Sequence, residues 1–212
     1  PLTPTGVIGG SQTFTATPAG ETPDGTITYV WTVDDITQGS TAATMDYTLA
    51  SPAGTKKIKV VATNTLSAGD PEIAEASTTI TVNKKENNST ITVTPASPAA
   101  VEIGTATTFT ANVSNQPTGA AIDYTWKVDG VAVDGQKQST FEYTPTTEGT
   151  KSITCSVTVT ATDYVDKTVE SSAVSLTVNK KANSSTLKIT PESPTTVFGV
   201  PITLTANVSS AP

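Results

Sequence analysis

A short aromatic pattern occurs twice in this 212-residue chain and sets the period of an internal repeat. Tyr29 and Trp31 form its first copy, and Tyr124 and Trp126 form the second copy 95 residues later. Residues two apart on a β-strand point to the same face, so each copy predicts a strand with one large apolar face. One such strand per repeat indicates one hydrophobic core per repeat.

Other phrases recur at the same period, at residues 13–16, 108–111 and 203–206. An internal repeat of this kind is the first guide to the domain boundaries. We expect a first domain at 1–83, a linker at 84–89, a second domain at 90–179 and a linker at 180–185. Residues 186–212 are expected to be the start of a third, truncated domain, because too few strands remain to close a core. Both linkers are polar and poor in apolar side chains.

Apolar alternation in the second repeat predicts strands at about 91–94, 106–113, 123–128, 131–133, 141–143, 151–162 and 174–178. A two-residue turn is expected at Asp129 and Gly130. The prolines that follow residue 94 suit an edge strand that breaks and changes sheets. About seven short strands separated by turns are typical of a Greek-key β-sandwich.

Composition agrees with an all-β chain, since about one residue in five is threonine and leucine is scarce. The net charge is −7, with no histidine and no arginine, so nucleic-acid binding is not expected. No apolar run reaches the roughly 18 residues of a membrane span, and no membrane partner is expected. The single cysteine, Cys155, cannot form an internal disulfide. Burial must therefore stabilise each domain, and we expect a structural core of Trp31, Trp126, Tyr29, Tyr124, Phe14, Phe109 and Cys155.

The spacing of the core residues resembles an immunoglobulin domain without its disulfide. A tryptophan lies on the third strand, and Ala111 and Cys155 stand where immunoglobulins place the cysteine pair. Ala16 and Val60 stand at the same positions in the first repeat. The resemblance implies all-β, tandem immunoglobulin-like Greek-key β-sandwiches without disulfides.

Four short segments resemble one particular family of immunoglobulin-like repeats. They are residues 4–8, 57–67, 92–100 and 161–164. They resemble the immunoglobulin-like repeats of the Hoc family, the highly immunogenic outer capsid proteins of T-even-like bacteriophages. The resemblance runs over essentially the whole chain. It implies a non-enzymatic decoration protein on the outer capsid surface of the virion, whose tandem domains project as an extended rod. It also implies attachment to the phage major capsid protein through a C-terminal domain absent from this sequence, and weak binding to bacterial surfaces or glycans. We expect a monomer without cofactors.

Candidate chemical sites each have a plainer interpretation. Cys155 could act as a nucleophile, but its alternation points inward and favours a core thiol. The loop carboxylates could bind calcium, although none has the spacing of a calcium loop, and solvated turns are favoured. These are Asp34, Asp35, Asp129, Asp163 and Asp166. No nucleophile with a base and no zinc spacing is present, so we expect no catalytic, cofactor or metal residues. The ligand-binding residues are not predicted.

Two other functions stay open from the sequence. One is a bacterial cell-surface adhesin or stalk built from similar repeats. The other is a carbohydrate-binding accessory module, which would need exposed aromatic rings. Only Tyr164 is expected to be exposed, because the other strand aromatics alternate inward.

Overall fold

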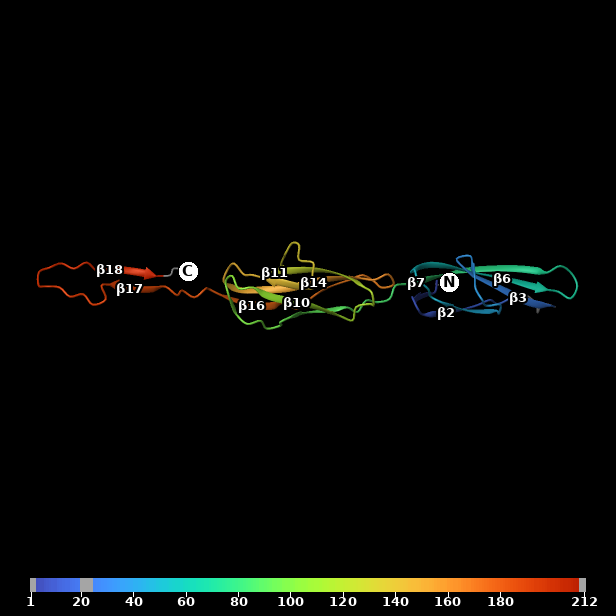
Figure 1. Cartoon of the computed structure of the whole chain (residues 1–212). Coiled ribbons are helices and arrows are strands. Elements are labelled where there is room, and N and C mark those ends of the chain that lie inside the picture. Colours follow the sequence, from blue (N-terminus) through green and yellow to red (C-terminus); the bar gives the residue numbers. More distant parts are fainter. Residues whose placement is uncertain (1–2, 20–24, 210–212) are drawn as a thin grey trace. The chain divides into compact units, whose positions relative to one another are not determined.

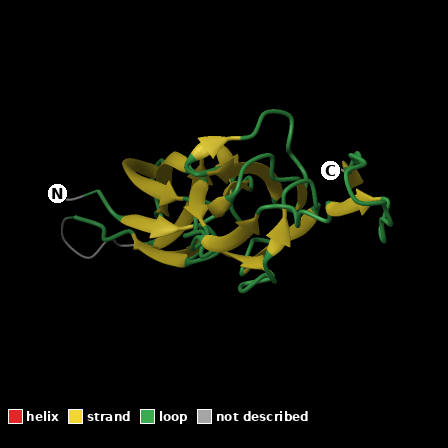
Figure 2. Ribbon diagram, turned by 90° about the vertical axis from the view of Figure 1, so that its left-hand side faces the viewer, coloured by secondary structure: helices red, strands yellow, loops and turns green. Residues whose placement is uncertain are grey.

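The computed structural model describes residues 3–19 and 25–209, and every regular element within these ranges is a β-strand (Figures 1 and 2). Repeat one contains β1 (Thr5–Val7), β2 (Ser11–Thr15), β3 (Thr26–Val33), β4 (Ile36–Thr37), β5 (Thr44–Thr48), β6 (Gly54–Thr65) and β7 (Glu72–Asn83). Repeat two contains β8 (Thr90–Thr94), β9 (Val101–Glu102), β10 (Thr107–Ser114), β11 (Ala121–Val128), β12 (Val131–Ala132), β13 (Thr140–Tyr143), β14 (Gly149–Thr160), β15 (Lys167–Glu170) and β16 (Val174–Asn179). Two further strands follow, β17 (Thr186–Thr190) and β18 (Thr205–Ser209).

Repeat one is a sandwich of two sheets. The larger sheet has the order β1-β7-β6-β3-β4, and the smaller sheet consists of β2 and β5. Neighbouring strands are antiparallel except for β1, which lies parallel to β7. Phe14 and Met45 of the smaller sheet share one buried cluster with Trp31 and Ile58 of the larger sheet. Apolar contact between the two sheets thus takes the place of a disulfide.

Repeat two has the same plan with one additional strand in each sheet. Its larger sheet has the order β12-β11-β14-β16-β9, with β15 beside β14, and its smaller sheet has the order β13-β10-β8. The predicted strands all exist. The chain does change sheets after Thr94, because β8 pairs with β10 whereas β9 pairs with β16. The short strands β9 and β15 were not predicted, although the equally short β12 and β13 were.

The same tight turn joins two strands in both repeats. Asp129 and Gly130 have φ values of 52° and 80° between the paired residues Val128 and Val131. Two central residues with positive φ make the two-residue hairpin turn that matches the twist of a β-ribbon. Asp34 and Asp35 adopt the same geometry in repeat one, with φ values of 48° and 65°. Aspartate tolerates this conformation better than most residues do.

Each core surrounds its tryptophan. Trp31 and Trp126 are 3% and 0% exposed, and each indole Nε1 donates a 2.9 Å hydrogen bond to a backbone carbonyl oxygen. The acceptors belong to Ala42 and Gln138. Buried indole N–H groups need such a partner. The centres of the Trp126 and Phe141 rings also lie 5.3 Å apart.

The third repeat is present as one β-hairpin. β17 and β18 pair antiparallel, with Leu187 opposite Val208 and Ile189 opposite Ala206. Leu187 and Ile189 are exposed. Two strands do not enclose a core.

Candidate functional site

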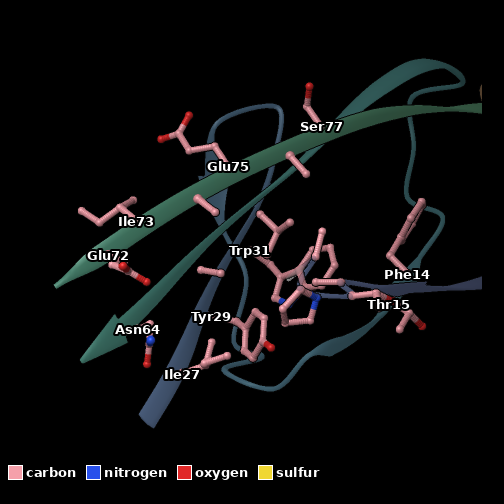
Figure 3. A pocket seen from close by; sticks show the side chains of 18 of the residues that line it. Phe14, Thr15, Ile27, Tyr29, Trp31, Asn64, Glu72, Ile73, Glu75 and Ser77 are labelled. Carbon is pink, nitrogen blue, oxygen red and sulfur yellow. The ribbon is translucent and has the colours of Figure 1, made fainter. Parts of the chain in front are cut away.

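Repeat one contains a pocket of about 930 Å³, which we name the repeat-one pocket. Its walls are residues 14–19, the inner face of β3, the end of β6 beyond Ile58 and the first half of β7. Figure 3 shows Ile27, Tyr29 and Trp31 directed into this space from β3. The floor of the pocket is therefore the apolar core of the repeat.

On the side of β7 the pocket is bordered by small side chains. β7 alternates: Ala74 and Ala76 lie opposite Ala62 and Val60 of β6. Glu75 and Ser77 point away from Trp31 (Figure 3). All of these positions are exposed, in contrast to Ile80 and Val82 further along the same strand. Small alanine side chains on the open part of β7 leave room beside the aromatic residues of β3.

Asn64 is the one polar side chain buried in the wall. It is 7% exposed, and neither its Nδ2 nor its Oδ1 has a hydrogen-bond partner among the described residues. It lies at the end of β6 and borders the pocket (Figure 3). A buried amide without partners is costly, so Asn64 marks a place where a polar group from elsewhere would be stabilised. The sequence carries a signal for this residue, because an asparagine continues the inward series of Ile58, Val60 and Ala62.

Two of the five loop carboxylates considered for calcium, Asp34 and Asp129, accept turn hydrogen bonds. Asp34 Oδ1 accepts a 2.8 Å hydrogen bond from the backbone N–H of Lys57, and Asp129 Oδ1 accepts one of the same length from Ser152. The bond from Lys57, with a smaller contribution from Lys56, holds the pKa of Asp34 below its usual value. Within residues 3–19 and 25–209, no three acidic or thiol side chains converge as a metal site.

The seven predicted core residues differ in burial. Six of them are buried, with Trp126, Phe109 and Cys155 fully so. Tyr124 is only half-buried, although Tyr29 is buried at the same position of its strand. The thiol of Cys155 is in no disulfide and is enclosed.

Tyr164 was expected to be an exposed ring, and that expectation is wrong. Tyr164 is half-buried, with the ammonium of Lys85 5.6 Å from its ring centre. Lys85 and Tyr164 also form a parallel β-bridge, and the N–H of Lys85 donates to the carbonyl oxygen of Asp163 at 2.8 Å. A ring held in this way is a poor platform for a sugar.

Residues assigned to the first linker carry further contacts. Asn87 and Ser89 are buried, and Asn87 Nδ2 donates to the carbonyl oxygen of Val159 at 3.2 Å. Asn87 Oδ1 accepts hydrogen bonds from the N–H and the hydroxyl of Ser89. This part of the chain is therefore fastened to the end of β14.

No helix within the described ranges is long and apolar enough to cross a bilayer. No family model matches the chain. Among solved structures, the fibronectin(III)-like modules of Clostridium thermocellum CbhA align with 84% of this chain and 90% of theirs, at 19% identity and a TM-score of 0.35. The tandem Ig repeats of Dlar align with 84% of this chain and 94% of theirs, at 15% identity and a TM-score of 0.29.

One curated protein is much more similar in sequence. The highly immunogenic outer capsid protein of Enterobacteria phage T4 is 55% identical over 212 residues, which is 100% of this chain. The chain spans 56% of the length of that protein. Identity at this level over an unbroken alignment makes the chain a homologue of the phage T4 outer capsid protein, Hoc, over a region of immunoglobulin-like repeats.

Proposed function

We propose that this chain is the immunoglobulin-like part of a non-enzymatic decoration protein on the outer capsid surface of a tailed phage. The 55% identity with the outer capsid protein of phage T4 over the whole chain carries this proposal. The closed core around Cys155 and the hydrogen-bonded aspartates Asp34 and Asp129 support a structural role rather than a catalytic one. Attachment to the major capsid protein belongs to a C-terminal domain outside the 212 residues.

The tandem domains project outward as an extended rod in this proposal. The longest strands, β6 and β14, have 12 residues each, which corresponds to about 40 Å at 3.3 Å per residue. Short polar joints between such sandwiches favour end-to-end arrangement over side-by-side packing. Small-angle scattering tests the rod, because a radius of gyration equal to that of a compact globule of this mass would contradict it.

Capsid binding is tested with the full-length protein that contains this chain. The full-length protein and a form without the 212 residues are each mixed with purified capsids and sedimented. We expect both forms to sediment with the capsids, whereas the 212-residue chain alone stays in the supernatant. Sedimentation of the chain alone would place the attachment site within these repeats. It would contradict the proposal that attachment belongs to a separate C-terminal domain.

Weak binding to bacterial surfaces or glycans is the second part of the proposal. Domains that project from the capsid are the parts exposed to other surfaces. All cationic side chains of this acidic chain are lysines. Binding of the chain to glycan arrays and to whole bacterial cells at high micromolar concentration is the test. A flat result in both assays would leave these repeats with a spacer function only.

A further inference from the structure

The sequence contains three pairs in which glycine follows aspartate, and the structure describes both residues of two of them. These two pairs are Asp129–Gly130 and Asp134–Gly135, both in repeat two. Asp24, in the third pair, lies outside the described residues. An aspartate before glycine is open to backbone rearrangement, because glycine has no side chain to hinder the approach of its nitrogen to the aspartate carboxyl group. In sequence the two described pairs have the same chemistry.

The rearrangement needs only the two residues and water. The glycine nitrogen attacks the aspartate Cγ, a C–N bond forms, the nitrogen loses its proton and a carboxyl oxygen leaves as water. Water then opens the resulting cyclic succinimide at either of its carbonyl carbons. One opening restores aspartate, and the other gives isoaspartate, in which the main chain runs through the former side chain and gains a carbon atom. The water released in the first step balances the water consumed in the second, and nothing is oxidised or reduced.

The fold holds the first pair away from this reaction. Asp129 Oδ1 accepts a 2.8 Å hydrogen bond from the backbone N–H of Ser152, and Asp129 Oδ2 lies 3.7 Å from the ammonium of Lys151. The N–H of Asp129 donates to the carbonyl oxygen of Ser152 at 2.8 Å, and β11 and β12 pair on both sides of the turn. The Asp129 carboxyl group must leave these partners before Gly130 can attack it, which requires local opening of the hairpin.

The second pair lies in the loop between β12 and β13. Asp134 and Gly135 are both exposed. Gly135 has a φ of 77°, and beyond the adjacent residues no atom lies within 4 Å of the place that a Cβ would occupy. Within residues 3–19 and 25–209, no hydrogen bond or ion pair engages the Asp134 carboxylate. The carboxyl group and the Gly135 nitrogen can therefore approach each other without any strand opening.

The loop keeps this freedom although both of its ends are fixed to the core. The N–H of Val133 donates to the carbonyl oxygen of Trp126 at 2.8 Å, and the Trp126 indole Nε1 donates to the carbonyl oxygen of Gln138 at 2.9 Å. Asp134 and Gly135 lie between these two anchors. The additional backbone carbon of isoaspartate is thus added to an exposed segment, and we expect the sandwich to stay folded around Trp126.

We propose that Asp134 is a site of spontaneous isoaspartate formation and that the hydrogen-bonded turn protects Asp129 from the same reaction. The product carries a free carboxylate on the carbon that formerly belonged to the main chain. This carboxylate is the group that isoaspartyl methyltransferases esterify with S-adenosylmethionine. The modified chain is therefore a substrate for enzymes of that class, whereas the unmodified chain is not.

The test incubates the folded 212-residue chain at neutral pH and physiological temperature. Cleavage after lysine then releases residues 128–137 as one peptide that contains both pairs. Electron-transfer fragmentation in a mass spectrometer distinguishes isoaspartate from aspartate at each position. We expect isoaspartate at position 134 to exceed that at position 129 by about tenfold or more, because reaction at Asp129 waits for local opening. Transfer of labelled methyl groups by an isoaspartyl methyltransferase to this peptide measures the same product independently.

Two controls separate the effect of the fold from that of the sequence. A synthetic peptide of residues 128–137 has both pairs without the fold, and there the two positions should react within about threefold of each other, since no opening step precedes either reaction. The variant Asp134→Glu keeps the charge, but attack on glutamate must close a larger ring and is far slower. Methyl transfer to the 128–137 peptide from this variant should therefore be lost.

Two results would overturn the proposal. Equal amounts of isoaspartate at positions 129 and 134 in the folded chain would show that the fold does not select between the pairs. Isoaspartate at position 134 of the synthetic peptide, with none at that position in the folded chain, would show that the loop protects Asp134 as well. Neither result bears on capsid sedimentation, so the proposed function is judged separately.

Discussion

The side-chain amide of Asn87 donates a hydrogen bond to the carbonyl oxygen of Val159, 72 residues further along the chain. Both residues are buried, so this bond fastens the beginning of the second sandwich to the end of its longest strand. Asn64 stands at the position of Val159 in repeat one, and its buried side-chain amide has no hydrogen-bond partner among the described residues. The two repeats thus differ at this position as well as in the number of strands in each sheet.

Asn87→Ala should destabilise repeat two by about 1–3 kcal/mol, because it leaves buried polar groups of Val159 and Ser89 without partners. Urea unfolding measured by tryptophan fluorescence checks this. Asn88→Ala is the matched control, since Asn88 is exposed and should shift stability by less than about 0.5 kcal/mol. Equal effects of the two substitutions would show that the Asn87 bond contributes nothing.

Asn64→Val should stabilise repeat one in the 212-residue chain by about 1–3 kcal/mol, because it replaces an unsatisfied buried amide with the residue type found in repeat two. Thermal unfolding is the measurement. Thr65→Val is the control, since Thr65 is the exposed neighbour on the same strand. A loss of stability in Asn64→Val would mean that the amide has a partner after all.

Trp126→Ala should cost about 3–5 kcal/mol, because it removes a fully buried ring and leaves a cavity in the core of repeat two. Val131→Ala serves for comparison, since Val131 is 71% exposed and should change stability by less than about 0.5 kcal/mol. Calorimetric unfolding of both variants decides the matter. A midpoint for Trp126→Ala close to that of the parent chain would refute the core assignment.

Asp34 gives repeat one a dependence on pH in the acid range. Its pKa is lowered in the folded state, chiefly by the hydrogen bond from the Lys57 N–H, so its charged form stabilises the fold. That contribution is complete above the unfolded pKa of about 3.9 and is lost as pH falls through the lower folded value. The stability difference between the parent chain and Asp34→Asn should therefore shrink below about pH 4. A difference independent of pH from 2 to 7 would contradict this.

The fold was largely predictable because burial follows alternation. Ile153, Cys155, Val157 and Val159 alternate in the sequence, and all four are fully buried on β14. The turn at Asp129 was predictable because few residue pairs accept positive φ.

The candidate site was not predictable from the same patterns. The pocket is lined by residues 14–19 together with side chains of β3, β6 and β7, and alternation within one strand does not encode how such distant segments come together. Tyr164 was placed wrongly for a related reason. Its ring is covered by Lys85, which lies 79 positions earlier in the chain and forms a parallel β-bridge with Tyr164. No local sequence pattern predicts this bridge. Asn64 could have been noticed, since it is polar in an inward series, but its meaning needed the comparison with Val159.

The central claim is that each of the first two repeats is a sandwich without a disulfide, closed around one buried tryptophan. A crystal structure of the chain tests it most directly. We predict that the indole Nε1 of Trp31 donates to the carbonyl oxygen of Ala42 and that of Trp126 to the carbonyl oxygen of Gln138, each inside its own core. A structure in which either indole faces solvent would contradict the claim.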